Sequence, residues 1–192
     1  RSSSKIKVNL NSTSKKLRNA IENLSLKKNK KKIIFSEKSL ENFYYIELIL
    51  NIYPNAKFIH SYRNLVDNTF AIYKQFLPNI SWSHTIEDIL LYIDNYLTVI
   101  DFFQKKYANK ILPVSLENFS KNPKKTSKQI YKFCDLRWSE SCLNFYKRQD
   151  LFINTASNNQ MRNKIEKYNY NKYEPYRETL KKYQKTYSWL KF

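Results

Sequence analysis

Residues 54–73 read PNAKFIHSYRNLVDNTFAIY, and this stretch decides the fold. A Pro-Asn turn leads into an apolar-rich segment, Ala56–Ser61, and after Arg63 the apolar residues take helical spacing as far as Tyr73. A strand followed at once by a helix indicates a βα unit, and α/β folds bind ligands at that junction. Free backbone N–H groups at the helix start favour an anion there, and a planar guanidinium suits a phosphate. The local pattern leaves open whether Arg63 binds an anion or merely pairs with Asp67, one turn further on.

Six features between Ser36 and Tyr73 fall in order with compatible spacing. They are an acidic-Lys pair, an Asn-aromatic pair, a Pro-Asn-Ala turn, a His, an Arg and an Asp, at Glu37-Lys38, Asn42-Phe43, Pro54-Asn55-Ala56, His60, Arg63 and Asp67. With these features the segment resembles the sulfotransferase superfamily, above all the bacterial sulfotransferases that often follow tetratricopeptide repeats and the tyrosylprotein sulfotransferases. The resemblance covers Ile33–Tyr176.

The resemblance implies an α/β domain, a mainly parallel sheet flanked by helices, of the sulfotransferase (P-loop-like) type. It also implies transfer of a sulfuryl group from 3′-phosphoadenosine 5′-phosphosulfate (PAPS) to a hydroxyl of a protein or carbohydrate acceptor, without a metal. By the same match Arg63 holds the 3′-phosphate with help from Arg162, and Asn68 is a further candidate from its place on the helix. Lys172 stands where the family has the Arg of a Gly-Arg-Trp motif, which makes it a further cofactor-binding residue.

For the transfer itself, the resemblance implies that Lys38 and Ser157 stabilise the moving sulfuryl group. A fixed ammonium suits this role because negative charge moves onto the leaving oxygen during the transfer. No residue of this chain is assigned as the base that deprotonates the acceptor, since its counterpart in the family lies further toward the N-terminus.

The chain departs from the family pattern in its phosphate contacts. Ala71 is in register with a Ser that shares the 3′-phosphate with the Arg, and a hydrogen bond worth roughly 1.5–3 kcal/mol is lost with it. Asn68 lies one turn earlier on the same helical face and is the candidate substitute. Leu40 replaces a Pro that the family usually has after the Lys, which changes the shape of that loop.

The sequence contains no Gly. This excludes both a Walker loop and a dinucleotide fingerprint, because each needs Gly where the backbone approaches phosphates. The strand-loop-helix that normally holds the 5′-phosphosulfate is not recognisable before Lys38, and the chain begins with Arg1. We therefore expect a partial domain, the C-terminal two-thirds, that turns over poorly by itself.

The formal net charge of +19 invites a polyanionic partner. Only seven of the 35 basic residues are Arg and 28 are Lys, and together with abundant Asn, Ile and Tyr this is what an AT-rich genome would produce. We read the KKNKKK run at 27–32 as a solvated turn rather than a nucleic-acid patch. Two alternatives to an active sulfotransferase remain open: a degenerate, non-catalytic relative and a basic nucleic-acid-binding module.

Cys134 and Cys142 lack metal-ligand spacing and are expected to be small buried apolar residues. No run of 18 apolar residues occurs, so no membrane segment is predicted, and we expect a cytoplasmic protein. His60 and His84 are expected to be structural, with His60 packed within its strand. Glu117 is expected to tie a strand end to neighbouring backbone.

The expected organisation is a flexible arm over 1–14 followed by one domain over 15–192. Three strands are predicted, at Ile33–Phe35, Ala56–Ser61 and Ile111–Val114. Helices are predicted at Lys15–Leu24, Asn42–Asn51, from after Arg63 to Tyr73, from a Thr85 cap to Tyr107, from an Asn122 cap and Pro123 onward, at Ser139–Arg148, and at Glu174–Tyr187.

Overall fold

The computed structural model describes residues 34, 36–75, 77–148 and 161–191, and the chain divides into two compact units, Arg1–Ala56 and Lys57–Phe192. In the described part of the first unit, a 3-10 helix, η1 (Asn42–Tyr45), continues directly into α2 (Ile46–Ile52). The predicted helix over Asn42–Asn51 is confirmed, with a first turn wound more tightly than an α-helix. Ile34 is not in a strand. The rest of the predicted strand Ile33–Phe35, the arm and the helix over Lys15–Leu24 lie outside the described residues.

The second unit is built on two parallel strands, β1 (Phe58–Tyr62) and β2 (Ile111–Ser115), in register from Phe58 with Ile111 to Tyr62 with Ser115. The connection between them holds α3 (Leu65–Lys74), η2 (Ser81–Ser83) and α4 (Ile86–Lys106). Parallel strands need such a long crossover, because a tight turn can only reverse the chain. The α/β class and the parallel pairing of the two described strands are as predicted.

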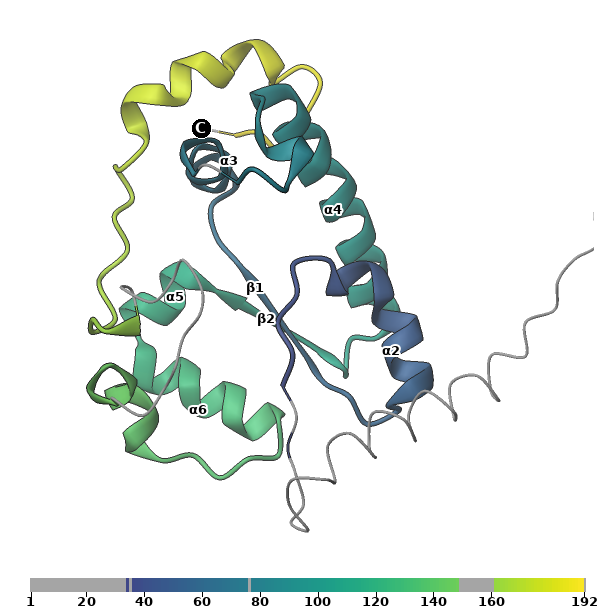
Figure 1. The fold of residues 1–192 in the computed structure, drawn as a ribbon, viewed down its shortest axis with the longest axis vertical. Coiled ribbons are helices and arrows are strands. Elements are labelled where there is room, and N and C mark those ends of the chain that lie inside the picture. The colour runs from purple at the N-terminus through teal and green to yellow at the C-terminus, as the bar shows by residue number, and fades with distance from the viewer. Residues whose placement is uncertain (1–33, 35, 76, 149–160, 192) are drawn as a thin grey trace, which may run out of the picture. The chain divides into compact units, whose positions relative to one another are not determined.

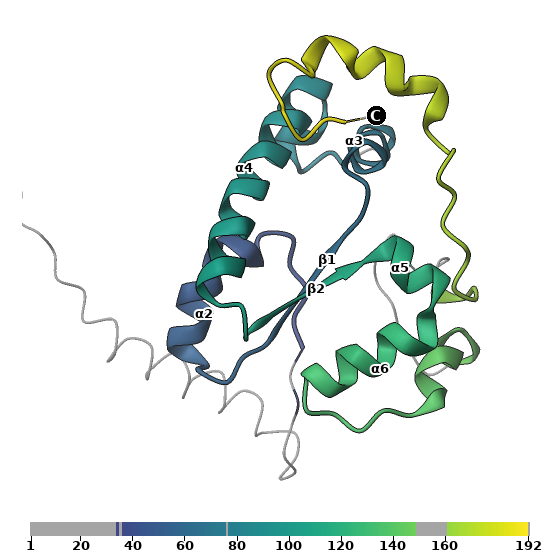
Figure 2. The same ribbon diagram turned by 180° about the vertical axis from the view of Figure 1, so that it is seen from behind.

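Further elements follow β2: α5 (Leu116–Lys121), α6 (Pro123–Phe133), η3 (Glu140–Lys147) and η4 (Glu174–Tyr183). Figures 1 and 2 show α4 on one side of the strand pair and α6 on the other. The short helix α5 was not predicted, because its six residues are too few to display a helical period. The helices expected at 139–148 and 174–187 are 3-10 helices, and η4 ends at Tyr183 rather than Tyr187.

Side-chain caps set where three of these helices begin. Asn64 Oδ1 accepts from the Asp67 N–H at 3.1 Å before α3, and Thr85 Oγ1 accepts from the Asp88 N–H at 3.1 Å before α4. Ser115 does the same for α5. The expectation that Asn122 caps α6 is wrong for its side chain, which makes no capping hydrogen bond. Pro123 needs no partner for a missing N–H, and its fixed φ already suits the first turn.

Helix α6 ends on a residue in the left-handed region, Asp135, with φ of 55°. The Leu136 N–H donates to the Tyr131 carbonyl at 2.8 Å and the Asp135 N–H to the Lys132 carbonyl at 3.2 Å. This pair of bonds is a Schellman motif, in which Gly usually takes the left-handed place. A chain without Gly uses Asp here, since a short polar side chain tolerates that conformation better than a branched one.

The core of the second unit joins α3, α4 and the C-terminal segment. Its buried members are Val66, Phe70, Leu90, Tyr173, Leu180 and Leu190. Leu180 of η4 is fully buried, and a buried Leu contributes about 1.5–3 kcal/mol relative to an exposed one. This packing fixes the last stretch of the chain against α3, the helix that follows Arg63 (Figure 1).

Candidate functional site

The carboxyl ends of β1 and β2 lie side by side, because Tyr62 and Ser115 are paired. Glu117 joins the residues beyond these ends: Oε1 accepts from the Asn64 N–H at 2.6 Å and Oε2 accepts from the Ser115 hydroxyl at 2.5 Å. The expectation that Glu117 ties a strand end to neighbouring backbone is confirmed. Its carboxylate fixes the turn from β1 into α3, where Arg63 lies.

Arg63 is half-buried, and its Nε donates to Asn68 Oδ1 at 3.0 Å. This contact orients the guanidinium along the first turn of α3. Within the described residues, no further hydrogen bond and no ion pair is recorded for Arg63, Asp67 included. The structure therefore does not show the alternative in which Arg63 forms an ion pair with Asp67. The terminal nitrogens of the guanidinium have no hydrogen-bond partner among the described residues, and Asn68 contacts Arg63 directly.

Asp67 is buried, with 2% of the residue exposed. Its Oδ2 accepts a hydrogen bond from the Tyr168 hydroxyl, while its Oδ1 is buried with no partner among the described residues. Burial and the bond to Asp67 raise the pKa of Tyr168, so the phenol stays protonated and donates. The Tyr168 backbone N–H donates to Ser120 Oγ at 3.2 Å, which anchors this segment to α5.

Tyr168 is the residue that the sequence analysis missed. It lies 101 positions from Asp67, in a polar, aromatic-rich stretch without regular period. A tyrosine among 16 gives no sequence signal for such a contact.

Lys38 lies exposed in the loop before η1, in the first unit. Glu37 organises this loop: its carboxylate accepts from the Ser39 N–H at 3.1 Å, from the Ser39 hydroxyl at 2.7 Å and from the Asn42 amide. The bond from Asn42, followed by those from Ser39, lowers the pKa of Glu37. The acidic residue of the acidic-Lys pair thus shapes the backbone that presents Lys38.

The remaining predicted site residues are in the C-terminal part. Ser157 lies outside the described residues. Arg162 Nη1 donates to the Arg148 carbonyl, and Lys172 Nζ lies 5.4 Å from the centre of the Tyr173 ring. Neither recorded contact is with Arg63 or Asn68, so the assignment of Arg162 and Lys172 to the 3′-phosphate stays a prediction.

The sequence model of the sulfotransferase family matches residues 5–140. The chain belongs to this family. It is also similar to an uncharacterized protein of Aquifex aeolicus (strain VF5), with 26% identity over 148 residues. The match takes in 75% of this chain and 19% of the Aquifex protein, so the chain spans about a fifth of the length of that relative.

Both histidines of this sulfotransferase-family chain have structural partners. The His60 side chain reaches from β1 to α4, where Gln104 Nε2 contacts Nδ1 at 3.0 Å and the Tyr96 hydroxyl contacts Nε2. Burial lowers the pKa of His60 and raises that of Tyr96 to about 12. His84 Nε2 contacts the Leu77 carbonyl at 3.1 Å. His60 packs within its strand, as expected, with its ring stacked on Tyr62 at 5.5 Å between ring centres, and it also reaches across to α4.

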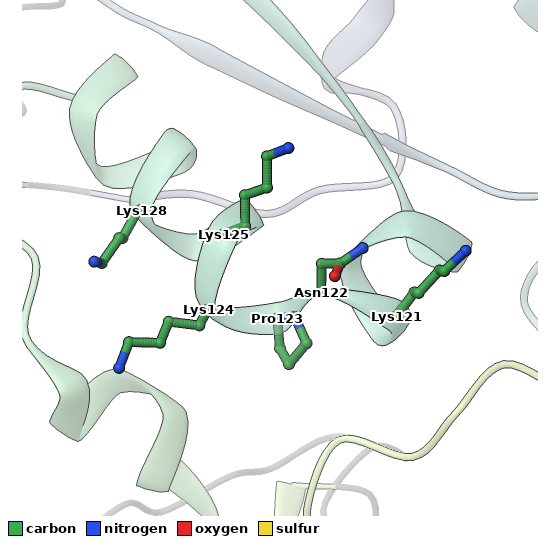
Figure 3. Close-up of a pocket in the computed structure, with 6 residues that line it drawn as sticks. All are labelled: Lys121, Asn122, Pro123, Lys124, Lys125 and Lys128. Carbon is green, nitrogen blue, oxygen red and sulfur yellow. The ribbon is translucent and has the colours of Figure 1, made fainter.

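A solvent-open hollow of about 570 Å³ lies at the start of α6, lined by Lys121, Asn122, Pro123, Lys124, Lys125 and Lys128. Lys124 pairs with Glu140 at 2.7 Å, and Lys128 Nζ lies 4.9 Å from the centre of the Trp138 ring. Figure 3 shows the lysine side chains pointing in different directions rather than converging. This hollow is a solvent-open lysine surface, and we base the site on Arg63 instead.

Among the described residues, no group of three or more His, Cys, Asp or Glu side chains could hold a metal ion. Cys134 and Cys142 are both free and half-buried, so the expectation that they are buried is wrong. No helix within the described ranges is both long and apolar enough to cross a membrane.

Proposed function

We propose that this chain supplies the 3′-phosphate half of the PAPS site in a sulfotransferase acting on a hydroxyl of a protein or carbohydrate. The observation that supports it most is the state of Arg63. Its Nε is held by Asn68, and no partner is recorded for its terminal nitrogens among the described residues. A planar fork at the carboxyl end of a parallel strand is the arrangement that binds a phosphate through two parallel N–H···O bonds.

Helix α3 begins two residues after Arg63 and has ten residues, so its positive dipole end lies beside the guanidinium. The carboxylates of Glu117 and Asp67 also lie at this junction, and the positive end of α3 opposes their effect on an anion bound by Arg63. One charge-assisted hydrogen bond is worth roughly 1.5–3 kcal/mol, which corresponds to about 10- to 150-fold in affinity. Adenosine 5′-phosphate lacks the 3′-phosphate and cannot make this contact.

The chemistry follows from the donor. In the transfer, the bond from sulfur to the bridging phosphate oxygen breaks and a bond from sulfur to the acceptor oxygen forms. The acceptor hydroxyl loses its proton to a base that we do not assign in this chain. Lys38 and Ser157 are the groups that we propose to stabilise the negative charge on the sulfuryl and bridging oxygens.

The test is a calorimetric titration of the chain with 3′-phosphoadenosine 5′-phosphate and, separately, adenosine 5′-phosphate at moderate salt. We expect a preference for the 3′-phosphorylated ligand that Arg63→Ala removes and that Arg137→Ala keeps. Arg137 is exposed and carries the same charge, so it controls for general electrostatics.

Equal binding of both nucleotides, or an equal loss in the two Arg variants, would contradict the proposal. Steep salt dependence for any polyanion without a 3′-phosphate preference would favour the nucleic-acid-binding alternative instead.

A further inference from the structure

Arg63 and Asp67 carry opposite charges on either side of the Asn64 cap of α3, and both act on the Tyr168 phenol, so they lie near one another. Asp67 is a buried carboxylate with one oxygen that has no partner among the described residues, a state that costs free energy unless the charge is compensated. An Arg beside it is the obvious compensation. The Arg63 Nε is nevertheless bonded to Asn68, and Asp67 is bonded to Tyr168.

We propose that Tyr168 is a positioning residue for the phosphate site. Its hydroxyl donates a hydrogen bond to the Asp67 carboxylate, and this keeps Asp67 from pairing with the Arg63 guanidinium, which stays available for an anion. Tyr168 acts through Asp67 and Arg63 and does not touch the phosphate. This inference rests on the proposed function and names a determinant of the same site.

Two observations support this role. The backbone of Tyr168 is held independently of Asp67, because its N–H donates to Ser120 Oγ on α5. The charges that act on the phenol are those of Asp67, Glu117 and Arg63, so all three lie around it. The phenol thus lies near both charges and bonds to one of them, Asp67.

Removing the hydroxyl creates a competitor for the phosphate. In Tyr168→Phe, Asp67 has neither oxygen bonded, and we expect it to attract the oppositely charged Arg63 guanidinium, which lies near it. A carboxylate that binds this guanidinium takes the same two N–H groups that a phosphate needs. The loss of affinity should therefore be confined to the 3′-phosphate and should depend on the negative charge of Asp67.

The experiment titrates 3′-phosphoadenosine 5′-phosphate and adenosine 5′-phosphate into the full chain and its variants. Tyr168→Phe is expected to weaken binding of the 3′-phosphorylated ligand by about tenfold, the value of one charge-assisted bond, and to leave adenosine 5′-phosphate unchanged. Tyr170→Phe is the matched control, because Tyr170 is 58% exposed and its ring centre lies 5.0 Å from that of Tyr168.

The double variant Asp67→Asn/Tyr168→Phe separates this role from a merely structural one. Without the carboxylate nothing competes for Arg63, so the double variant should recover wild-type affinity although it lacks more native hydrogen bonds. The ratio of the two nucleotide affinities keeps the test valid if a variant is partly unfolded, because unfolding lowers both affinities equally.

Wild-type affinity in Tyr168→Phe, or a double variant as weak as Tyr168→Phe, would overturn the inference while Arg63-dependent binding keeps the proposed function intact. Binding that does not depend on Arg63 in the wild-type background would overturn both.

Discussion

Replacing Glu117 with Gln should loosen the two strand ends that carry the candidate site. The carboxylate accepts from the Asn64 N–H at 2.6 Å and from the Ser115 hydroxyl at 2.5 Å, one bond on each oxygen. Glutamine has the same size but a single side-chain oxygen. Its oxygen can keep the Asn64 N–H, but its NH₂ group then faces Ser115, whose hydroxyl must turn from donor to acceptor.

The size of the effect follows from these two bonds. Both charge-assisted bonds become neutral ones, and each is then worth about 1 kcal/mol less. Asn64 is exposed and Ser115 half-buried, so water replaces part of what is lost. We expect a net loss of about 1–2 kcal/mol in the free energy of unfolding.

The assay is urea unfolding followed by far-ultraviolet circular dichroism, with the loss seen as a lower midpoint at unchanged slope. Glu178→Gln is the matched control: it removes the same charge from an exposed pair with Lys181, and such pairs contribute little. An unfolding midpoint for Glu117→Gln equal to that of Glu178→Gln would refute the reasoning.

Three further predictions concern stability. Thr85→Ala should lower the unfolding free energy by about 1 kcal/mol, because it removes the cap of α4. Thr98→Ala, on the exposed face of α4, is the control and should lower it less, as measured by the urea midpoints of the two variants. Acidification below pH 6.5 should destabilise the chain. Burial lowers the pKa of His60, so below pH 6.5 the unfolded chain binds more protons than the folded chain. The difference between the urea midpoints above and below pH 6.5 should be smaller in His60→Gln than in the wild type. Asp135→Gly should raise the unfolding free energy by less than about 1 kcal/mol, because Gly adopts the left-handed conformation without strain, while the lost ion pair with Lys57 has an 82% exposed carboxylate and contributes little. A lower thermal midpoint would contradict this.

The βα junction and the capped helices could be predicted from the sequence because their determinants are local. Alternation, helical spacing and cap residues lie within a few positions of one another, and the strand ending before Arg63 and the Thr85 cap both follow from them. The family resemblance then gave Arg63 a role that local spacing left open.

Long-range contacts could not be predicted from the sequence. The pairing of Tyr168 with Asp67 joins positions 101 residues apart, and no periodicity encodes it. The 3-10 winding of η3 and η4 was also missed, since an amphipathic pattern with charges on one side fits either helix type in short segments. The prediction that the Asn122 side chain caps α6 was wrong, because Asn is only a statistical preference at that position. Pro123 alone suffices to begin the helix.

The claim that Arg63 binds the 3′-phosphate is tested most directly by ³¹P nuclear magnetic resonance of 3′-phosphoadenosine 5′-phosphate, because the two phosphorus atoms give separate signals. On addition of the chain we predict that the 3′ signal shifts, that Arg63→Ala abolishes this shift, and that Arg137→Ala preserves it. A shift confined to the 5′ signal, or a 3′ shift that survives in Arg63→Ala, would contradict the account.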